Sequence, residues 1–190
     1  MIDLECLPYA VGHADEGVCL VVRMGPYRIL LDCGLRDLSG LQATRSHLAL
    51  PADLVLCSHA HPDHARGLLA LHRQFPQLPI YASEVTSQLL PLNWLHEEPE
   101  ALPLFCHALP WRTPIEFQDG LSAELFPAGH LPGAAVIVLT YFPPRQPGEK
   151  TPRFYRILYT GDFFLSNSRL VEGLPLEELR ALHPDVLIVE

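Results

Sequence analysis

The chain has 190 residues, of which 48% are hydrophobic and 18% charged, so it can bury the core of one domain and is not intrinsically disordered. Thirteen basic residues stand against 22 acidic ones, and the formal net charge of −9 counts against indiscriminate binding of nucleic acid. The longest apolar stretch, residues 134–142, is too short to cross a membrane. The N-terminus carries acidic residues where a signal peptide has basic ones, so we expect a cytoplasmic protein without membrane contact.

The N-terminal third is rich in strand-forming residues. Residues 18–24 and 27–32 are β-branched and leucine-rich, and the Gly25-Pro26 pair between them predicts a β-hairpin. Residues 54–58 predict a short strand that is apolar on both faces. Nineteen prolines in the chain indicate many short elements and argue against a helical bundle.

Two helices are expected in the middle of the chain. Proline is favoured in a first helical turn, and apolar residues recur at helical spacing up to Phe75, which predicts one helix from about Pro62. A brief strand at residues 80–82 leads to a second helix. Ser83 is suited to cap that helix, and Pro91 is expected to end or kink it.

The remainder of the chain predicts a loop followed by strands. Residues 99–114 contain prolines at 99, 103, 110 and 114 and predict an irregular loop. Beyond it we expect a hairpin loop over residues 143–152, a short helix over 176–182, and strands at 121–127, 134–142, 154–160 and 185–190. The pattern indicates a single α/β domain.

Five scattered cysteines form no CxxC pair. An odd number at these spacings predicts neither a disulfide framework nor a thiolate zinc site. We interpret Cys19, Cys33 and Cys57, which lie in apolar runs, as small buried hydrophobic side chains.

The segment Ser58-His59-Ala60-His61-Pro62-Asp63-His64 directly follows a predicted strand. His59 and His61 are two apart in an extended segment and therefore project to the same side, while Asp63 and His64 lie at the mouth of the predicted helix. Imidazole and carboxylate groups suit zinc and similar divalent ions. A pattern with three histidines and an aspartate in this register arises by chance in about one chain in a thousand, so we interpret it as a metal-binding motif.

Two further strand ends carry candidate ligands. His130 stands between glycines in Ala128-Gly129-His130-Leu131-Pro132-Gly133, and Asp162 follows Thr160-Gly161. Taken alone, His130 is more readily a loop or core histidine and Asp162 a turn residue. Beside the first motif, both become candidate metal ligands.

Together these segments resemble the metallo-β-lactamase superfamily and, within it, the β-CASP nucleases, the branch of RNase J and the pre-mRNA 3′-end cleavage endonuclease. The matching segments follow the family order and cover nearly the whole chain: Leu31-Asp32-Cys33-Gly34, Ser58–His64, AGHLPGA at 128–134, TGDF at 160–163 and PDVLIVE at 184–190. The resemblance implies an α/β (α+β) fold, the four-layer αββα sandwich, with residues 1–190 forming its N-terminal portion and its second half incomplete at the C-terminus.

The resemblance also implies two divalent metal ions, zinc by preference, with manganese and iron as alternatives. Six residues of this chain match the family's ligands. They divide into three for the first ion (His59, His61 and His130), two for the second (Asp63 and His64) and one that bridges both (Asp162).

Further residues match the family's supporting and catalytic positions. Asp32 would orient a ligand imidazole by accepting its distal N–H. Asp63, His64 and Glu190 are the candidate catalytic residues, with Asp63 orienting the attacking hydroxide and Glu190 lying near the site. The implied reaction is hydrolysis of an RNA phosphodiester by a hydroxide that two metal ions activate.

The C-terminus departs from the family pattern. In β-CASP nucleases the strand matching residues 185–190 is followed by an inserted β-CASP domain and a closing segment with a last histidine for the second ion. Neither follows Glu190 here, so we expect either a truncated form or a natural short form completed by another polypeptide, with self-association as an alternative. For this chain alone we expect metal occupancy closer to one than two, and weak or no nuclease activity.

Three functions are compatible with these residues. The favoured one is a ribonuclease, with RNA as partner and its endonuclease or exonuclease mode open. The second is a generic hydrolase of a small thioester, lactone or phosphodiester, which suits the acidic net charge. The third is a non-catalytic scaffold or partner subunit. A basic segment predicts a solvated hairpin tip or, alternatively, a contact to a phosphate backbone: Arg145, Lys150, Arg153 and Arg156.

Overall fold

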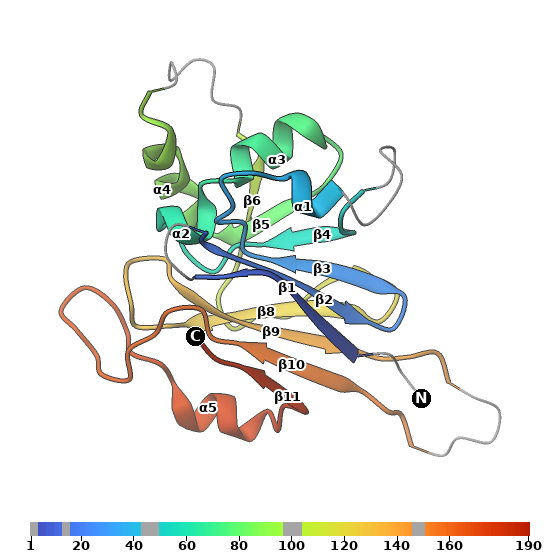
Figure 1. Cartoon of the computed structure of the whole chain (residues 1–190). Helices are drawn as coiled ribbons and strands as arrows, with labels where there is room; N and C mark the ends of the chain where they lie inside the picture. The colour runs from blue at the N-terminus through green and yellow to red at the C-terminus, as the bar shows by residue number, and fades with distance from the viewer. Residues whose placement is uncertain (1–3, 13–15, 43–49, 97–103, 146–150) are drawn as a thin grey trace. The chain divides into compact units, whose positions relative to one another are not determined.

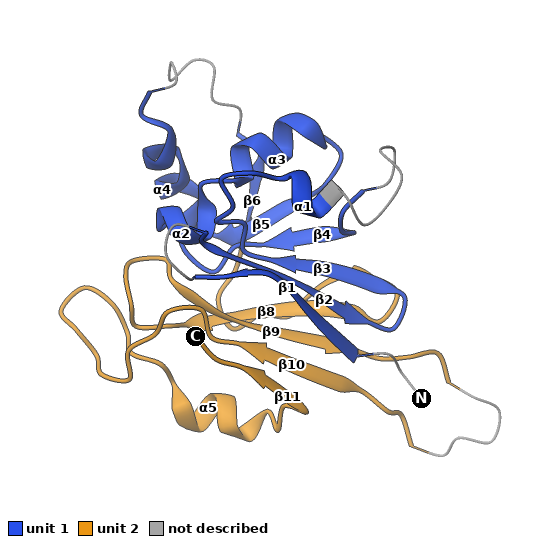
Figure 2. Cartoon of the chain, in the orientation of Figure 1, with its two compact units in different colours: residues 1–108 blue, residues 109–190 orange. Residues whose placement is uncertain are grey.

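A computed structural model describes residues 4–12, 16–42, 50–96, 104–145 and 151–190 of the chain (Figure 1). They form two compact units, residues 1–108 and 109–190 (Figure 2). Each unit is organised around its own β-sheet. The organisation of residues 1–190 as one domain stays a prediction.

The sheet of the first unit has the strand order β1-β2-β3-β4-β5-β6. Its strands are β1 (Leu4–Val11), β2 (Val18–Met24), β3 (Tyr27–Leu31), β4 (Leu54–Leu56), β5 (Ile80–Ser83) and β6 (Cys106–Leu109). β1, β2 and β3 pair antiparallel, and β4 pairs parallel with β3 and β5. The predicted hairpin is confirmed, because Met24 faces Tyr27 across the Gly25-Pro26 turn.

Among the described residues, five short helices accompany this sheet: α1 (Ser39–Gln42), α2 (Pro62–Ala65), α3 (Leu68–Gln74), α4 (Glu84–Leu89) and the 3-10 helix η1 (Leu90–Trp94). Leu68 and Leu71 of α3 and Trp94 of η1 pack in one cluster with Val21 and Leu30 of the sheet. A hydrophobic core therefore fixes α3 and η1 to one face of the sheet.

The prediction of one continuous helix from Pro62 is wrong, because the segment divides into α2 and α3 at Gly67. The Gly67 N–H donates to the Cys33 carbonyl at 2.9 Å. A Cβ placed on Gly67 would lie 2.7 Å from the Leu35 carbonyl oxygen. The close approach to residues 33–35 interrupts the helix, and helical periodicity carries no sign of such a long-range contact.

The predicted start of α4 is confirmed, since the Ser83 hydroxyl accepts a hydrogen bond from the Thr86 N–H at 3.1 Å. The Ser83→Ala variant should lose about 1 kcal/mol of unfolding free energy, because a buried helix-terminal N–H loses its acceptor. Urea denaturation measures the loss. Ser87→Ala is the matched control, since the Ser87 hydroxyl only donates to the Glu84 carbonyl within the same helix. Equal midpoints for the two variants would contradict the capping role.

The sheet of the second unit has the order β11-β10-β9-β8-β7. Its strands are β7 (Ile115–Gln118), β8 (Leu121–Pro127), β9 (Ala135–Tyr141), β10 (Tyr155–Tyr159) and β11 (Val186–Ile188). β11 pairs parallel with β10, and the other neighbours pair antiparallel. Helix α5 (Leu176–Ala181) packs through Leu179 against Phe126 and Val136.

The four strands predicted in this unit are confirmed as β8 to β11, and the loop predicted over residues 99–114 is wrong in part. Residues 97–103 lie outside the described residues, but β6 occupies residues 106–109, and Trp111 bridges to Leu125 of β8.

In the basic segment, Arg156 is bound within the unit: its Nε donates to the Thr140 hydroxyl at 3.2 Å, and its Nη1 donates to the Leu182 carbonyl. Lys150 lies outside the described residues.

Among the described residues, no helix is both long and apolar enough to span a membrane.

Candidate metal centre

In the first unit, the predicted motif occupies the turn from β4 into α2. His61 is the N-cap of α2 with extended backbone, and Pro62 takes the first helical position, where its missing N–H costs nothing. His59 and His64 are buried, whereas His61 and Asp63 are exposed. The turn thus places two imidazoles in the protein interior and two donors at its surface.

The three imidazoles of this turn lie together. His59 Nε2 lies 3.2 Å from His61 Nδ1, and the rings of His59 and His64 have centroids 4.0 Å apart. Two nitrogens at this separation suit a common ion, because each would lie about 2.0–2.1 Å from zinc. A second pair of potential donors, one oxygen and one nitrogen, is formed by Asp63 Oδ2 and His64 Nε2, which lie 3.9 Å apart.

Asp32, at the end of β3, anchors this turn from inside. Its side chain is fully buried and accepts hydrogen bonds from the Ser58 N–H at 2.6 Å and the Ser58 hydroxyl at 2.7 Å. Asp32 Oδ2 also lies 2.9 Å from His64 Nδ1. A carboxylate on Nδ1 favours the tautomer whose Nε2 lone pair is available to a metal. This is the geometry that the predicted supporting role requires.

The backbone of Asp32 is itself unusual, with φ at 57°, in the left-handed region. A residue with a Cβ pays roughly 1 kcal/mol or more for this conformation. Aspartate tolerates it better than most residues, and here the three side-chain contacts hold it in place.

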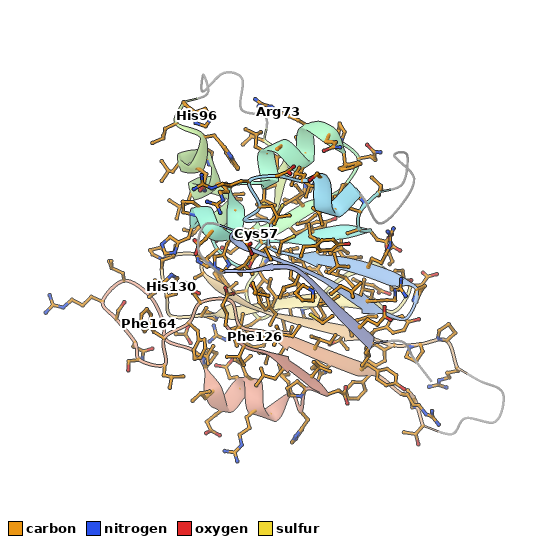
Figure 3. The ribbon with its side chains drawn as sticks, viewed as in Figure 1. Cys57, Arg73, His96, Phe126, His130 and Phe164 are labelled. Atoms are coloured by element: carbon orange, nitrogen blue, oxygen red, sulfur yellow. The ribbon has the colours of Figure 1, made fainter. Side chains whose placement is uncertain are left out.

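The turn is also clamped by close backbone packing. A Cβ on Gly34 would lie 1.6 Å from the Asp63 carbonyl oxygen, and a Cβ on Gly17 would lie 2.8 Å from the same atom. The thiol of Cys57, labelled in Figure 3, donates to the His59 carbonyl at 3.1 Å. Asn93 Nδ2 donates to the Ala60 carbonyl at 2.9 Å. The sequence analysis missed Gly17 and Asn93, because their partners are distant along the chain.

In the second unit, His130 lies in the connection between β8 and β9, and Asp162 follows β10. Gly129 and Gly133 have φ of 77° and 89°, so glycine is required on both sides of His130. His130 Nε2 lies 3.3 Å from Asp162 Oδ2, and its ring stacks on Phe164 with centroids 5.6 Å apart (Figure 3). The structure thus brings together the two predicted ligands of this unit.

Glu190 follows β11 and is engaged by its neighbours. Its Oε2 accepts a hydrogen bond from the Tyr159 hydroxyl at 2.9 Å, and its N–H donates to the Thr160 hydroxyl at 3.2 Å. These contacts fix Glu190 at the carboxyl end of β10, which ends three residues before Asp162. Its catalytic role stays a prediction.

The thiols offer weaker competition for a metal than the imidazoles. Burial raises the pKa of Cys106 to about 12. A hydrogen bond with Cys33, together with burial, raises the pKa of Cys19 well above the usual value for a thiol. The raised pKa values keep both thiols protonated at neutral pH when no metal is bound, and the candidate ligands named above all offer nitrogen or oxygen atoms. The donor chemistry fits zinc, manganese or iron.

Comparison with known sequences finds a family model and several curated relatives that match most of the chain. Residues 27–164 match the family model described as "Beta-lactamase superfamily domain". The uncharacterized protein sll0514 of Synechocystis is 54% identical over 99% of this chain and 32% of its own length. Probable RNase MJ4 of Methanocaldococcus jannaschii is 30% identical, and the match covers 90% of this chain and 41% of that protein. Ribonuclease TTHA0252 of Thermus thermophilus is also 30% identical, and the match covers 71% of this chain and 35% of that protein.

Solved structures agree in fold. The metallo-β-lactamase fold protein YhfI of Bacillus subtilis matches with a TM-score of 0.53 at 19% identity, covering 83% of this chain and 59% of that one. A protein of unknown function from Enterococcus faecalis matches with a TM-score of 0.59 at 23% identity, and the match covers 97% of this chain and 49% of that one. The predicted mixed α/β fold with two sheets is confirmed.

The chain spans between 32% and 41% of the length of the curated relatives named above. Two of them are named as ribonucleases, which agrees with the predicted resemblance to a nuclease branch. The matched region of the family model includes the Ser58–His64 motif, His130 and Asp162. The chain therefore belongs to the β-lactamase superfamily and has the metallo-β-lactamase fold.

Proposed function

We propose that this chain is the metal-binding part of a ribonuclease that hydrolyses RNA phosphodiesters. The observation that carries the proposal is the Ser58–His64 turn, where His59 and His61 face each other at 3.2 Å and Asp32 orients His64. Metal-binding histidines commonly have a carboxylate on the ring nitrogen that does not bind the metal, and Asp32 occupies this position on His64. The ribonuclease names of two relatives support RNA as the substrate.

Six residues would hold two divalent ions, with zinc preferred and manganese or iron as alternatives. We assign His59, His61 and His130 to the first ion, Asp63 and His64 to the second, and Asp162 to both. Bound divalent ions supply a lowered pKa for water and neutralise the charge that develops on the phosphodiester. The arrangement of the two units that this requires is part of the proposal.

The chain's own residues have distinct tasks in the reaction. Asp63 is exposed at the start of α2, so its carboxylate can accept a proton from an attacking water and orient it. Asp32 keeps His64 in one tautomer through Nδ1. Glu190, held by the Tyr159 hydroxyl, is a second carboxylate available to position water.

The proposal is tested by incubating the chain, in excess, with a 5′-labelled single-stranded RNA. We expect slow cleavage that a chelator stops and that Asp63→Asn reduces by about 10²-fold or more, the range of a lost general base. Asp119→Asn is the matched control, because Asp119 lies in the turn between β7 and β8. Cleavage that the chelator leaves unchanged, or that Asp63→Asn slows no more than Asp119→Asn does, would contradict the proposal.

A second function is favoured by the net charge of −9, which repels a polyanion. The same donor set would serve a hydrolase of small thioesters, lactones or phosphodiesters. Thioester or lactone turnover that depends on Asp63, with RNA untouched, would support this alternative. A chain that binds metal yet hydrolyses none of these substrates would indicate a scaffold or partner subunit.

A further inference from the structure

The loop that follows β10 exposes large apolar side chains. Residues 164–170 are all exposed, and they include Phe164 at 58%, Leu165 at 58% and Leu170 at 84% exposure. The preceding residue, Phe163, instead packs against the hydrophobic core of the second unit. Apolar surface gathered on one loop is unfavourable in water and is typical of an interaction site.

The backbone of Phe164 is held in place. Its N–H donates to the Ala128 carbonyl at 2.9 Å, and its carbonyl accepts the Leu174 N–H at 2.8 Å. A Cβ on Gly129 would lie 2.3 Å from the Phe164 carbonyl oxygen, so the loop is in close backbone contact with the segment that carries His130. Two hydrogen bonds thus fix the base of a compact loop, from which the aromatic side chain extends.

The ring of Phe164 lies beside a candidate metal ligand (Figure 3). It stacks on the His130 imidazole with centroids 5.6 Å apart and planes 28° apart, and His130 Nε2 lies 3.3 Å from Asp162 Oδ2. More than half of the Phe164 side chain is exposed, so this contact leaves π surface that another planar ring can cover. In a nucleic-acid strand that passes His130 and Asp162, the planar rings are the bases.

The charge of the loop suits a polyanion. Residues 163–171 include one basic residue, Arg169, and no acidic residue, although the chain carries a net charge of −9. The acid that follows, Glu172, pairs with Arg112. A positive group near an exposed aromatic ring is the combination found in sites for single-stranded nucleic acid.

We infer that Phe164 stacks on a base of a single-stranded RNA whose backbone passes His130 and Asp162. The inference rests on the proposed function, and it adds a substrate contact that lies outside the metal ligands. Every base presents a π face, so this contact would strengthen binding without selecting a sequence.

The test is the binding of two fluorescein-labelled, phosphorothioate-linked strands, which resist cleavage, measured by anisotropy. One strand carries RNA bases in mixed sequence, and the other has the same length and linkages but is abasic. The wild-type chain should bind the strand with bases about tenfold more tightly, which is within the range of one base–aromatic stack. Phe164→Leu keeps an apolar side chain but removes the π surface, so it should reduce this preference to about twofold or less.

The comparison of the two strands separates stacking from a change in metal binding. Loss of a metal ion from the Phe164→Leu chain would weaken the binding of both strands alike, because an ion contacts phosphate oxygens. Loss of a stack weakens the binding of the strand with bases alone. The salt dependence should stay as in the wild type, because the substitution removes no charge.

Phe164→Trp should restore the preference for bases, since indole offers a larger π surface. Phe142→Leu is the matched control: Phe142 is a similarly exposed aromatic residue that stacks on Phe154, and it follows β9, whereas His130 precedes that strand. This control should bind both strands within about twofold of the wild type, as is usual for a surface substitution away from a site.

The inference is overturned if the wild type binds the two strands equally or binds neither. It is also overturned if Phe142→Leu loses the preference as fully as Phe164→Leu does. A wild-type preference in Phe164→Leu would overturn it as well, and would leave the apolar loop as a surface for a protein partner.

The binding result is separable from the cleavage result. If the chain cleaves no RNA while Phe164→Leu loses the preference for bases, the inference stands and the proposed activity fails. If cleavage depends on Asp63 and Phe164→Leu keeps the preference, the activity stands and the inference fails.

Discussion

The His59→Ala/His61→Ala variant should lose most of the metal that the wild-type chain retains through purification. His59 Nε2 and His61 Nδ1 lie 3.2 Å apart, so removing both imidazoles eliminates two of the three histidine donors that we assign to the first ion. Elemental analysis should find less than about 0.2 metal ions per variant chain. Exposed histidines outside the motif provide the control, and His107→Ala/His183→Ala should keep wild-type content.

Stability should follow metal content in the same variant. A ligand that binds only the folded chain stabilises it by about 2.7 kcal/mol at a concentration one hundred times its dissociation constant. The melting temperature of the wild type should therefore fall on addition of a chelator, whereas that of the double variant should not move. Metal retained by the double variant, or a wild-type melting temperature indifferent to chelator, would refute this assignment of ligands.

Asp32→Ala should be among the most destabilising single substitutions in the first unit, costing about 3 kcal/mol or more of unfolding free energy. The substitution leaves the buried Ser58 N–H, the Ser58 hydroxyl and His64 Nδ1 without their shared acceptor. It also keeps a Cβ at φ 57°. Asp32→Gly loses the same contacts but relieves the backbone, so it should be more stable than Asp32→Ala by about 1 kcal/mol.

Urea denaturation of the two variants beside Asp37→Ala separates these effects. Asp37 is exposed and bonded to Ser39, so its removal should leave the midpoint close to the wild type. An Asp32→Ala midpoint as high as that of Asp37→Ala would show that the buried contacts contribute little. An Asp32→Gly variant less stable than Asp32→Ala would contradict the backbone argument.

Elements set by local chemistry were predictable from the sequence. The β2–β3 hairpin follows from two β-branched runs around Gly25-Pro26, and α4 begins where Ser83 offers an acceptor. β8 lies at Leu121–Pro127, the range that the sequence predicted for this strand. In each case the signal and the structure it predicts lie within a few residues of each other.

Elements set by distant contacts were not predictable. β6 lies between prolines, and this composition predicted a loop; the strand is stabilised by its pairing in the sheet. β7 alternates between half-buried and exposed residues, so its apolar signal is weak. Gly67 interrupts the helix through the Cys33 carbonyl, 34 residues earlier in the chain. These outcomes depend on tertiary packing, which local propensity does not encode.

The candidate site divides in the same way. The histidines and aspartates were visible because their types and spacing carry chemistry, and within each unit the structure brings them together. Their supports, such as Asn93 on the Ala60 carbonyl and Gly17 against Asp63, were invisible because they act through backbone atoms of distant residues.

X-ray absorption spectroscopy at the zinc edge of the purified chain tests the central claim most directly, because it reports the ligands of the bound ion. With His59, His61 and His130 as donors, the spectrum should show only nitrogen and oxygen neighbours at about 2.0–2.1 Å, with the outer-shell scattering of imidazole rings. His59→Ala/His61→Ala should remove most of that signal. A sulfur neighbour at about 2.3 Å, or a chain purified without chelator that holds no metal, would contradict the account.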